Sequence, residues 1–243
     1  MEQAEPRGGD LVRRHGWPTR AWHWLNLLAM AVLLMSGLMI FNAHPRLYWG
    51  EAGSEAAQAW LDLWGQDGLP FPGWITIPSA YNLADARLWH FFFAWLLAPA
   101  WVLYLGWNLR RWRLTREVLP RRADLAPAHL WQDLRDHLAL RFPRGAAALR
   151  YKPLQKLAYA AVLAGLIPLV IVTGMAMSPA LDAALRLTVA LGGRATARSL
   201  HFLAAGGLVA FFVVHLAMVL LAGPINGLRA MLTGWYRLPK ERG

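Results

Sequence analysis

The feature that most constrains this chain is the segment 199–228, SLHFLAAGGLVAFFVVHLAMVLLAGPINGL, which contains no Asp, Glu, Lys or Arg. A segment of this length and polarity can cross a bilayer as one helix. It contains two histidines, His201 and His215, which are fourteen residues apart. Fourteen residues make about four helical turns, so both rings leave the same side of the helix about 21 Å apart along its axis.

An imidazole inside hydrocarbon is costly, and polar groups at such positions usually serve a function. Two imidazoles on one helix face, near opposite membrane surfaces, therefore indicate two stacked cofactor sites. The other ligands of these sites have to come from other helices of the same chain.

The composition is that of a membrane protein, because 57% of the residues are hydrophobic and only 16% are charged. The chain has no cysteine, which excludes disulfides, iron–sulfur clusters and thiolate zinc sites. Its net charge of +11 does not indicate a nucleic-acid partner, because the basic residues lie between apolar segments. This distribution is typical of the positive-inside topology of membrane proteins.

We expect a single all-α integral-membrane domain, 1–243, that forms a bundle of four transmembrane helices. The expected spans share an apolar, nearly uncharged sequence and cover residues 21–43, 88–109, 157–181 and 199–228. Of the 25 lysines and arginines, 20 lie in the amino-terminal segment, the second connection and the tail. This bias predicts that both termini are cytoplasmic, and the first span shows no signal-peptide cleavage pattern.

The connections between the spans are of three kinds. The first, 41–86, is long, acidic, aromatic and rich in Pro and Gly, which is typical of a functional loop such as a docking surface. Within it, 58–64 is expected to form a short surface helix. The second connection is basic and includes 128–140, whose periodicity predicts an amphipathic helix on the membrane surface. The third, 182–198, is a short amphipathic connection.

This topology pairs the histidines of the spans by depth. His23 and His215 fall in the cytoplasmic half, whereas His90 and His201 fall in the outer half, and each pair comes from two different helices. Two facing imidazoles are suitable axial ligands for haem iron, and a six-coordinate iron suits electron transfer. Zinc is the weaker interpretation, because two histidines leave it short of ligands.

Three arginines, Arg20, Arg87 and Arg198, each lie three residues before a histidine of the spans. Three residues is almost one helical turn toward the water, so each guanidinium could bind haem propionates. The alternative is that these arginines simply flank membrane spans.

Small residues accompany the histidines: Gly37, Gly174 and the run 204–207. They allow either a macrocycle edge or a neighbouring helix to approach closely. The remaining histidines lie in polar segments and are expected to face solvent; they are His15, His44, His129 and His137.

Four segments carry a family resemblance: TRAWHWLN (19–26), RLWHFFFAWL (87–96), YKPLQKLAY (151–159) and SLHFLAAGGL (199–208) with His215 fourteen residues after His201. The chain resembles the bacterial di-haem cytochrome b subunits of nickel–iron hydrogenase, formate dehydrogenase and thiosulfate reductase, and is most similar to the thiosulfate-reductase type. The resemblance implies two b haems, with His23 paired to His215 and His90 to His201. It also implies a quinone site and a periplasmic partner enzyme.

The expected function is electron transfer in the bacterial inner membrane, between the quinone pool and a periplasmic oxidoreductase of the molybdopterin type. The direction of electron flow is open, and no catalytic residue is assigned. The residues considered for quinone lie at helix ends, where they could equally solvate those ends: Asn26, Tyr151, Lys152 and Gln155.

Two other functions are compatible with the sequence. One is a stand-alone haem b oxidoreductase that passes electrons from a small periplasmic reductant such as superoxide to quinone, which a basic pocket around Arg87 and Arg198 would favour. The other is a transporter or structural anchor without a cofactor. The acidic, aromatic loop 41–86 favours protein docking instead.

Overall fold

The computed structural model describes residues 7–51, 53, 58–64, 69–112, 118–143 and 145–240. Among these residues, four helical segments are long and apolar enough to cross a membrane: α1 (Trp17–Asn42), α2 (Leu83–Arg110), the segment Gly145–Met177 and α8 (Arg194–Ala222). The expected helical membrane bundle is confirmed. Large apolar side chains point outward from these helices, such as Phe92 and Leu103, which are 66% and 73% exposed, as lipid-facing residues must be.

The third segment is not one regular helix. It consists of η5 (Gly145–Leu149), α4 (Pro153–Ala160), the π-helical turn η6 (Ala161–Leu166) and α5 (Ile167–Met177). Pro168 explains the wide turn, because proline has no N–H to donate and its ring crowds the carbonyl four residues earlier. The carbonyl of Leu163 in this turn accepts a hydrogen bond from the indole of Trp101 at 3.0 Å.

The expectation that the fourth span runs unbroken to residue 228 is wrong, because α8 ends at Ala222. Gly223 has a φ of 113° and Pro224 starts the next helix, α9 (Pro224–Thr233). A left-handed glycine followed by a residue that cannot donate a backbone hydrogen bond ends a helix at this point. Proline also acts at Pro179, which begins α6 (Pro179–Leu185), so the third span ends at Met177 rather than at 181.

The chain divides into two compact units, and each contains a part of all four long helical segments. We call 1–24, 101–163 and 210–243 the terminal unit, since it contains both ends of the chain. The other unit, 25–100 and 164–209, contains the long first connection, and we call it the loop unit.

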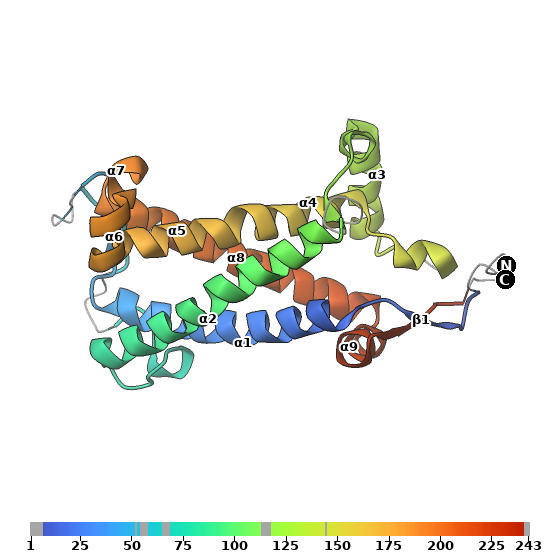
Figure 1. The fold of residues 1–243 in the computed structure, drawn as a ribbon, viewed down its shortest axis with the longest axis horizontal. Helices are drawn as coiled ribbons and strands as arrows, with labels where there is room; N and C mark the ends of the chain where they lie inside the picture. The colour runs from blue at the N-terminus through green and yellow to red at the C-terminus, as the bar shows by residue number, and fades with distance from the viewer. Residues whose placement is uncertain are drawn as a thin grey trace. The chain divides into compact units, whose positions relative to one another are not determined.

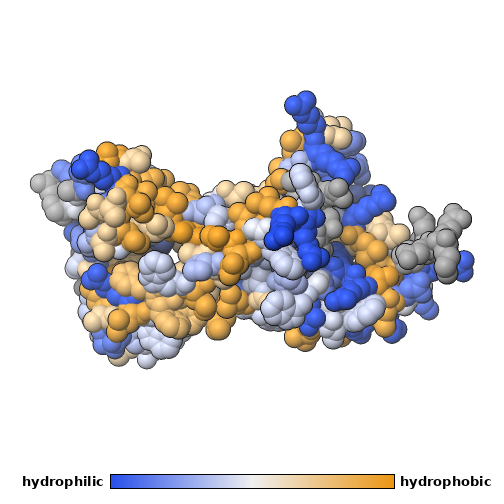
Figure 2. Space-filling view, viewed as in Figure 1, coloured by the Kyte–Doolittle hydropathy of each residue, from blue (hydrophilic) through white to orange (hydrophobic). Residues whose placement is uncertain are grey.

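In the terminal unit, β1 (Leu11–Arg13) pairs antiparallel with β4 (Trp235–Arg237), and α9 packs against β4 (Figure 1). The helix expected at 128–140 is present as α3 (Pro127–Leu138). It packs on α4, and the short turn η4 (Arg122–Leu125) packs on α3. Hydrophilic side chains gather over α3, as expected for a helix on a membrane surface (Figure 2).

In the loop unit, the prediction of a surface helix at 58–64 is wrong. The segment instead forms β3 (Leu61–Asp62), which pairs antiparallel with β2 (Arg46–Leu47). The side chains of Arg46 and Asp62 form an ion pair at 2.9 Å across this ladder, which fixes its register. The short helices η2 (Gly73–Ile75), α6 and α7 (Leu187–Leu191) complete this unit, and α6 and α7 pack on α5 (Figure 1).

The long connection is held to the start of α8 by buried polar contacts. Ser199, which has no exposed surface, donates its hydroxyl to the Tyr48 carbonyl at 2.6 Å and accepts the Trp60 indole N–H at 2.9 Å. The backbone of Gly50 exchanges hydrogen bonds with Thr196. Next to it, Gly193 has a φ of 108°, and a Cβ there would overlap the Gly50 carbonyl oxygen.

We therefore expect Gly193→Ala to lower the midpoint of thermal unfolding in detergent much more than Gly192→Ala. Gly192 also has a positive φ, 77°, but a Cβ there meets only Thr196 Oγ1 at 4.0 Å. The Gly192 variant should lose about 1–2 kcal/mol for left-handed backbone alone, whereas the Gly193 variant adds the overlap. Equal losses in the two variants would contradict this docking of the connection onto α8.

Candidate functional site

The loop unit brings together two histidines of the spans, His90 from α2 and His201 from α8. Their ring centres are 6.2 Å apart, and the ring planes make an angle of 60°. Both rings lie in apolar helices, away from the helix ends where water would solvate them. Such a placement requires that every ring nitrogen has a partner.

The separation of the two rings fits one metal ion between them. A metal–imidazole bond is about 2.0–2.1 Å and a ring centre lies about 1.2 Å behind its nitrogen, so two imidazoles on opposite sides of one metal have centres about 6.4 Å apart. Within the described part of the chain, no group of three or more His, Cys, Asp or Glu side chains is placed to hold a metal. A pair of imidazoles suits a metal that brings its other ligands with it, as haem iron does.

The other two long helical segments each supply a buried hydroxyl to this pair. Ser36 Oγ of α1 lies 3.0 Å from His90 Nδ1, and Thr173 Oγ1 of α5 lies 3.0 Å from His201 Nδ1. Neither Ser36 nor Thr173 has exposed surface. Each hydroxyl also lies 2.6 Å from the carbonyl four residues before it, that of Val32 or Leu169.

Sequence reasoning missed these two hydroxyls, although a signal was present. Each is followed directly by a glycine, and a Cβ on Gly37 or Gly174 would lie 3.4 Å from Cε1 of His90 or His201. A hydroxyl–glycine pair in a span opposite a histidine could therefore have been recognised. By contrast, Gly207 packs against Leu166, where a Cβ would lie 3.2 Å from its methyl groups, so this glycine serves helix packing.

The second pair of histidines lies in the terminal unit. His23 of α1 and His215 of α8 are close enough to interact electrostatically. His215 stacks on Phe211, with ring centres 5.7 Å apart and an angle of 16° between the planes. Among the described residues, Nδ1 of His23 is buried and has no hydrogen-bond partner, which marks it as a polar atom that a bound group could satisfy.

The three arginines that precede the histidines have different surroundings. Arg198 is half-buried, donates to the His44 carbonyl and lies 3.3 Å from His44 Nδ1. Arg20 donates to the carbonyls of Met231 and Leu232 at the end of α9. Arg87 is exposed, with its guanidinium 5.8 Å from the centre of the Phe91 ring.

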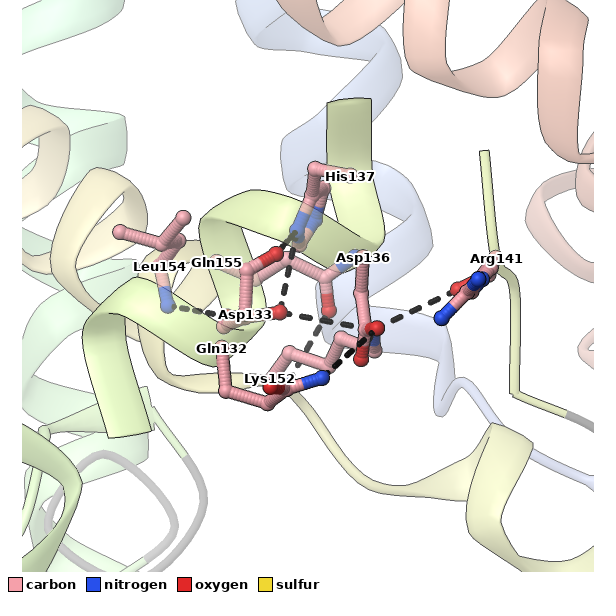
Figure 3. A network of polar contacts seen from close by, with 8 residues as sticks. All are labelled: Gln132, Asp133, Asp136, His137, Arg141, Lys152, Leu154 and Gln155. Carbon is pink, nitrogen blue, oxygen red and sulfur yellow. Dashed lines mark hydrogen bonds and ion pairs between the residues drawn. The ribbon is translucent and has the colours of Figure 1, made fainter. Parts of the chain in front are cut away.

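Of the residues considered for quinone, Lys152 and Gln155 take part in a polar network at the start of α4 (Figure 3). Lys152 Nζ lies 3.4 Å from both Asp133 and Asp136, and Gln155 accepts the backbone N–H of Lys152 at 3.1 Å. These contacts serve the helix end. A shallow pocket of about 250 Å³ lies over Asp133, Asp136 and Lys152.

The other two quinone candidates lie elsewhere. Tyr151 makes an edge contact with Tyr159 at 5.4 Å. Asn26 belongs to the loop unit, and its buried amide oxygen has no hydrogen-bond partner among the described residues. Such an atom is costly unless a ligand or water satisfies it.

Three of the four histidines of the polar segments are less solvated than expected. His15 is buried, with 8% of its surface exposed, which contradicts the expectation for that residue. His137 lies 3.0 Å from the buried carboxylate of Asp133, and His44 contacts Arg198. In the network of Figure 3, Nδ1 of His137 also lies 2.7 Å from the backbone carbonyl of Asp133. His129 is exposed as expected.

Comparison with known proteins places this chain in a family. The family model for prokaryotic cytochrome b561 matches residues 14–234, which include all four histidines of the spans. A protein of Azospira oryzae, provisionally named protein-methionine-sulfoxide reductase subunit YedZ1, is 30% identical over 202 residues, which are 83% of this chain and 87% of the relative. The chain belongs to the prokaryotic cytochrome b561 family and is a bacterial multi-pass membrane protein that binds haem b and transfers electrons.

Proposed function

We propose that this chain carries electrons across the bacterial inner membrane between the quinone pool and an oxidoreductase partner. The observation that carries the proposal is the pair His90 and His201, whose separation of 6.2 Å suits two axial ligands of one iron. His90 and His201 would hold a haem, which would supply a one-electron couple, and an iron held by two protein ligands would favour electron transfer over binding of a substrate.

We further propose that His90 and His201 ligate one haem, and that His23 and His215 ligate a second. The support for the second pair is their electrostatic proximity and the unpaired, buried Nδ1 of His23. Two haems at different depths would divide the membrane crossing into shorter steps. Their iron centres belong to different units of the chain, as the four histidines do.

The arginines are proposed to bind the haem propionates. A guanidinium has five N–H donors, so the carbonyl contacts of Arg20 and Arg198 leave donors for a carboxylate. Arg87 is exposed on the first turns of α2 and is free to swing toward a propionate beside His90.

Both termini and the second connection are proposed to lie on the cytoplasmic side, and the first and third connections on the periplasmic side. The support is the distribution of lysine and arginine, since 20 of the 25 lie in the amino-terminal segment, the second connection and the tail. In this orientation the connection anchored by Ser199 and Gly193 lies on the periplasmic surface.

The partner is proposed to be a periplasmic oxidoreductase that docks on the loop unit. The name of the Azospira relative suggests that the partner is a reductase of protein methionine sulfoxide. More specifically, we propose that the partner is a molybdopterin enzyme. The proposed docking surface includes the ion pair of Asp62 with Arg46. The backbone N–H of Trp64, and secondarily Arg46, hold the pKa of exposed Asp62 below its usual value, so this carboxylate stays ionised.

Quinone is proposed to bind beside α1, with Asn26 as its best-supported contact. Asn26 lies three residues after His23, on the same helix face, and has the unpaired amide oxygen. Tyr151, Lys152 and Gln155 are secondary candidates, because Lys152 and Gln155 already pair with their own neighbours.

A stand-alone oxidoreductase that takes electrons from superoxide is the alternative. It would need a basic pocket around Arg87 and Arg198 that is open to the periplasm, whereas Arg198 is half-buried against His44. The partner-docking function is therefore preferred.

We expect His201→Ala and His90→Ala each to remove one of two haems and to leave the other spectroscopically intact. The measurement is haem per chain, together with the dithionite-reduced α band of the purified protein. His129→Ala is the control, because His129 is exposed on α3, where it hydrogen-bonds the nearby Ala123 carbonyl. Retention of both haems in either span variant would refute the assigned pair.

We expect Asn26→Leu to slow the reduction of haem by added quinol by up to about tenfold, because a polar contact to the quinone head group is lost. Reduction by dithionite should stay unchanged, which separates quinone binding from haem binding. Leu138→Ala serves as the control, because Leu138 ends α3 and is 77% exposed. A wild-type rate in the Asn26 variant would place the quinone site elsewhere.

A further inference from the structure

We infer that Ser36 and Thr173 are positioning residues that hold His90 and His201 as Nδ1–H tautomers and thereby lower the reduction potential of the haem between them. This inference rests on the proposed ligation by His90 and His201. It concerns residues of α1 and α5 that lie outside the ligand pairs.

The direction of each hydrogen bond follows from the donor inventory. A hydroxyl has one hydrogen to donate. Two oxygens 2.6 Å apart repel each other unless a hydrogen lies between them, so Ser36 donates to Val32 and Thr173 donates to Leu169. Each hydroxyl is then left with lone pairs alone to offer to the imidazole.

The imidazoles must therefore donate. Nδ1 of His90 and Nδ1 of His201, each 3.0 Å from a hydroxyl oxygen, carry hydrogen. A neutral imidazole with hydrogen on Nδ1 has its lone pair on Nε2, which is the nitrogen left to bind iron.

The same contacts affect the iron. A hydroxyl that donates to a carbonyl is polarised and becomes a stronger acceptor, so it draws the Nδ1 hydrogen outward and makes the ring a better donor to metal. Greater electron donation stabilises ferric over ferrous iron, which lowers the reduction potential. The two helices repeat this arrangement, so both axial ligands of this haem are affected alike.

In the other pair of histidines, His23 lacks this support within the described part of the chain, because its Nδ1 has no hydrogen-bond partner there. Removing a hydroxyl from α1 or α5 should consequently change one haem and leave the second as it was. This selectivity separates a local electronic effect from a general loosening of the fold.

Thr173→Val tests the inference, because valine keeps the shape and removes the hydroxyl. We expect both haems to be retained and the midpoint potential of one to rise. At a fixed solution potential, its ratio of reduced to oxidised haem should increase by up to about tenfold, which is about 59 mV for one electron. Thr173→Ser restores the hydroxyl and should restore the potential. Thr233→Val is the control, since Thr233 makes the same bond to its own i−4 carbonyl at the end of α9.

The measurements are redox titration of each α band and pulsed EPR of protein with isotope-labelled histidine, which reports the hydrogen bond at the remote ring nitrogen. Loss of one haem in Thr173→Val that Thr173→Ser restores also supports the inference. Wild-type potentials and EPR spectra in Thr173→Val overturn it, as does loss of haem in both variants, which assigns Thr173 to packing. Retention of both haems in His201→Ala instead refutes the ligand assignment, whatever Thr173 does.

Discussion

Burying an imidazole among apolar helices is the constraint on which this structure depends. A ring nitrogen in hydrocarbon has no water to satisfy it, so each nitrogen needs a partner from the protein or from a bound group. In the loop unit this need organises four helical segments, because α2 and α8 present His90 and His201 while α1 and α5 present Ser36 and Thr173. The contacts that orient the two histidines are therefore also contacts that pack the four helical segments together.

The need to give every polar group in the membrane a hydrogen-bond partner also explains a contact at the irregular part of the third segment. Pro168 removes a donor from the backbone and forces the wide turn η6, which leaves carbonyl groups without their regular helical partners. Trp101 of α2 satisfies the Leu163 carbonyl with its indole N–H. A helix defect inside a membrane is thus compensated by a neighbouring helix, as the absence of water demands.

The spans and their histidines were predictable from the sequence, because charge-free segments and buried imidazoles are strong local signals. The ends of the helices were harder to predict. The fourth span was predicted to continue beyond Gly223 and Pro224 because the sequence stays apolar, although a glycine followed by a proline itself signals the end of a helix. The segment 58–64 has helical composition, yet pairing with β2 and the ion pair of Arg46 with Asp62 make it a strand. Ser36 and Thr173 went unrecognised because a hydroxyl in a span reads as ordinary packing until its neighbour across the bundle is known.

The ladder between β1 and β4 has a topological consequence. Val12 lies opposite Tyr236 and the strands exchange backbone hydrogen bonds, and two paired strands cannot be separated by a bilayer. Both ends of the described chain must therefore emerge on one membrane face, whichever face that is, and the chain between them crosses an even number of times. This closure also means that the first and last spans are tied together outside the lipid, by a three-residue ladder that joins the two ends of the described chain.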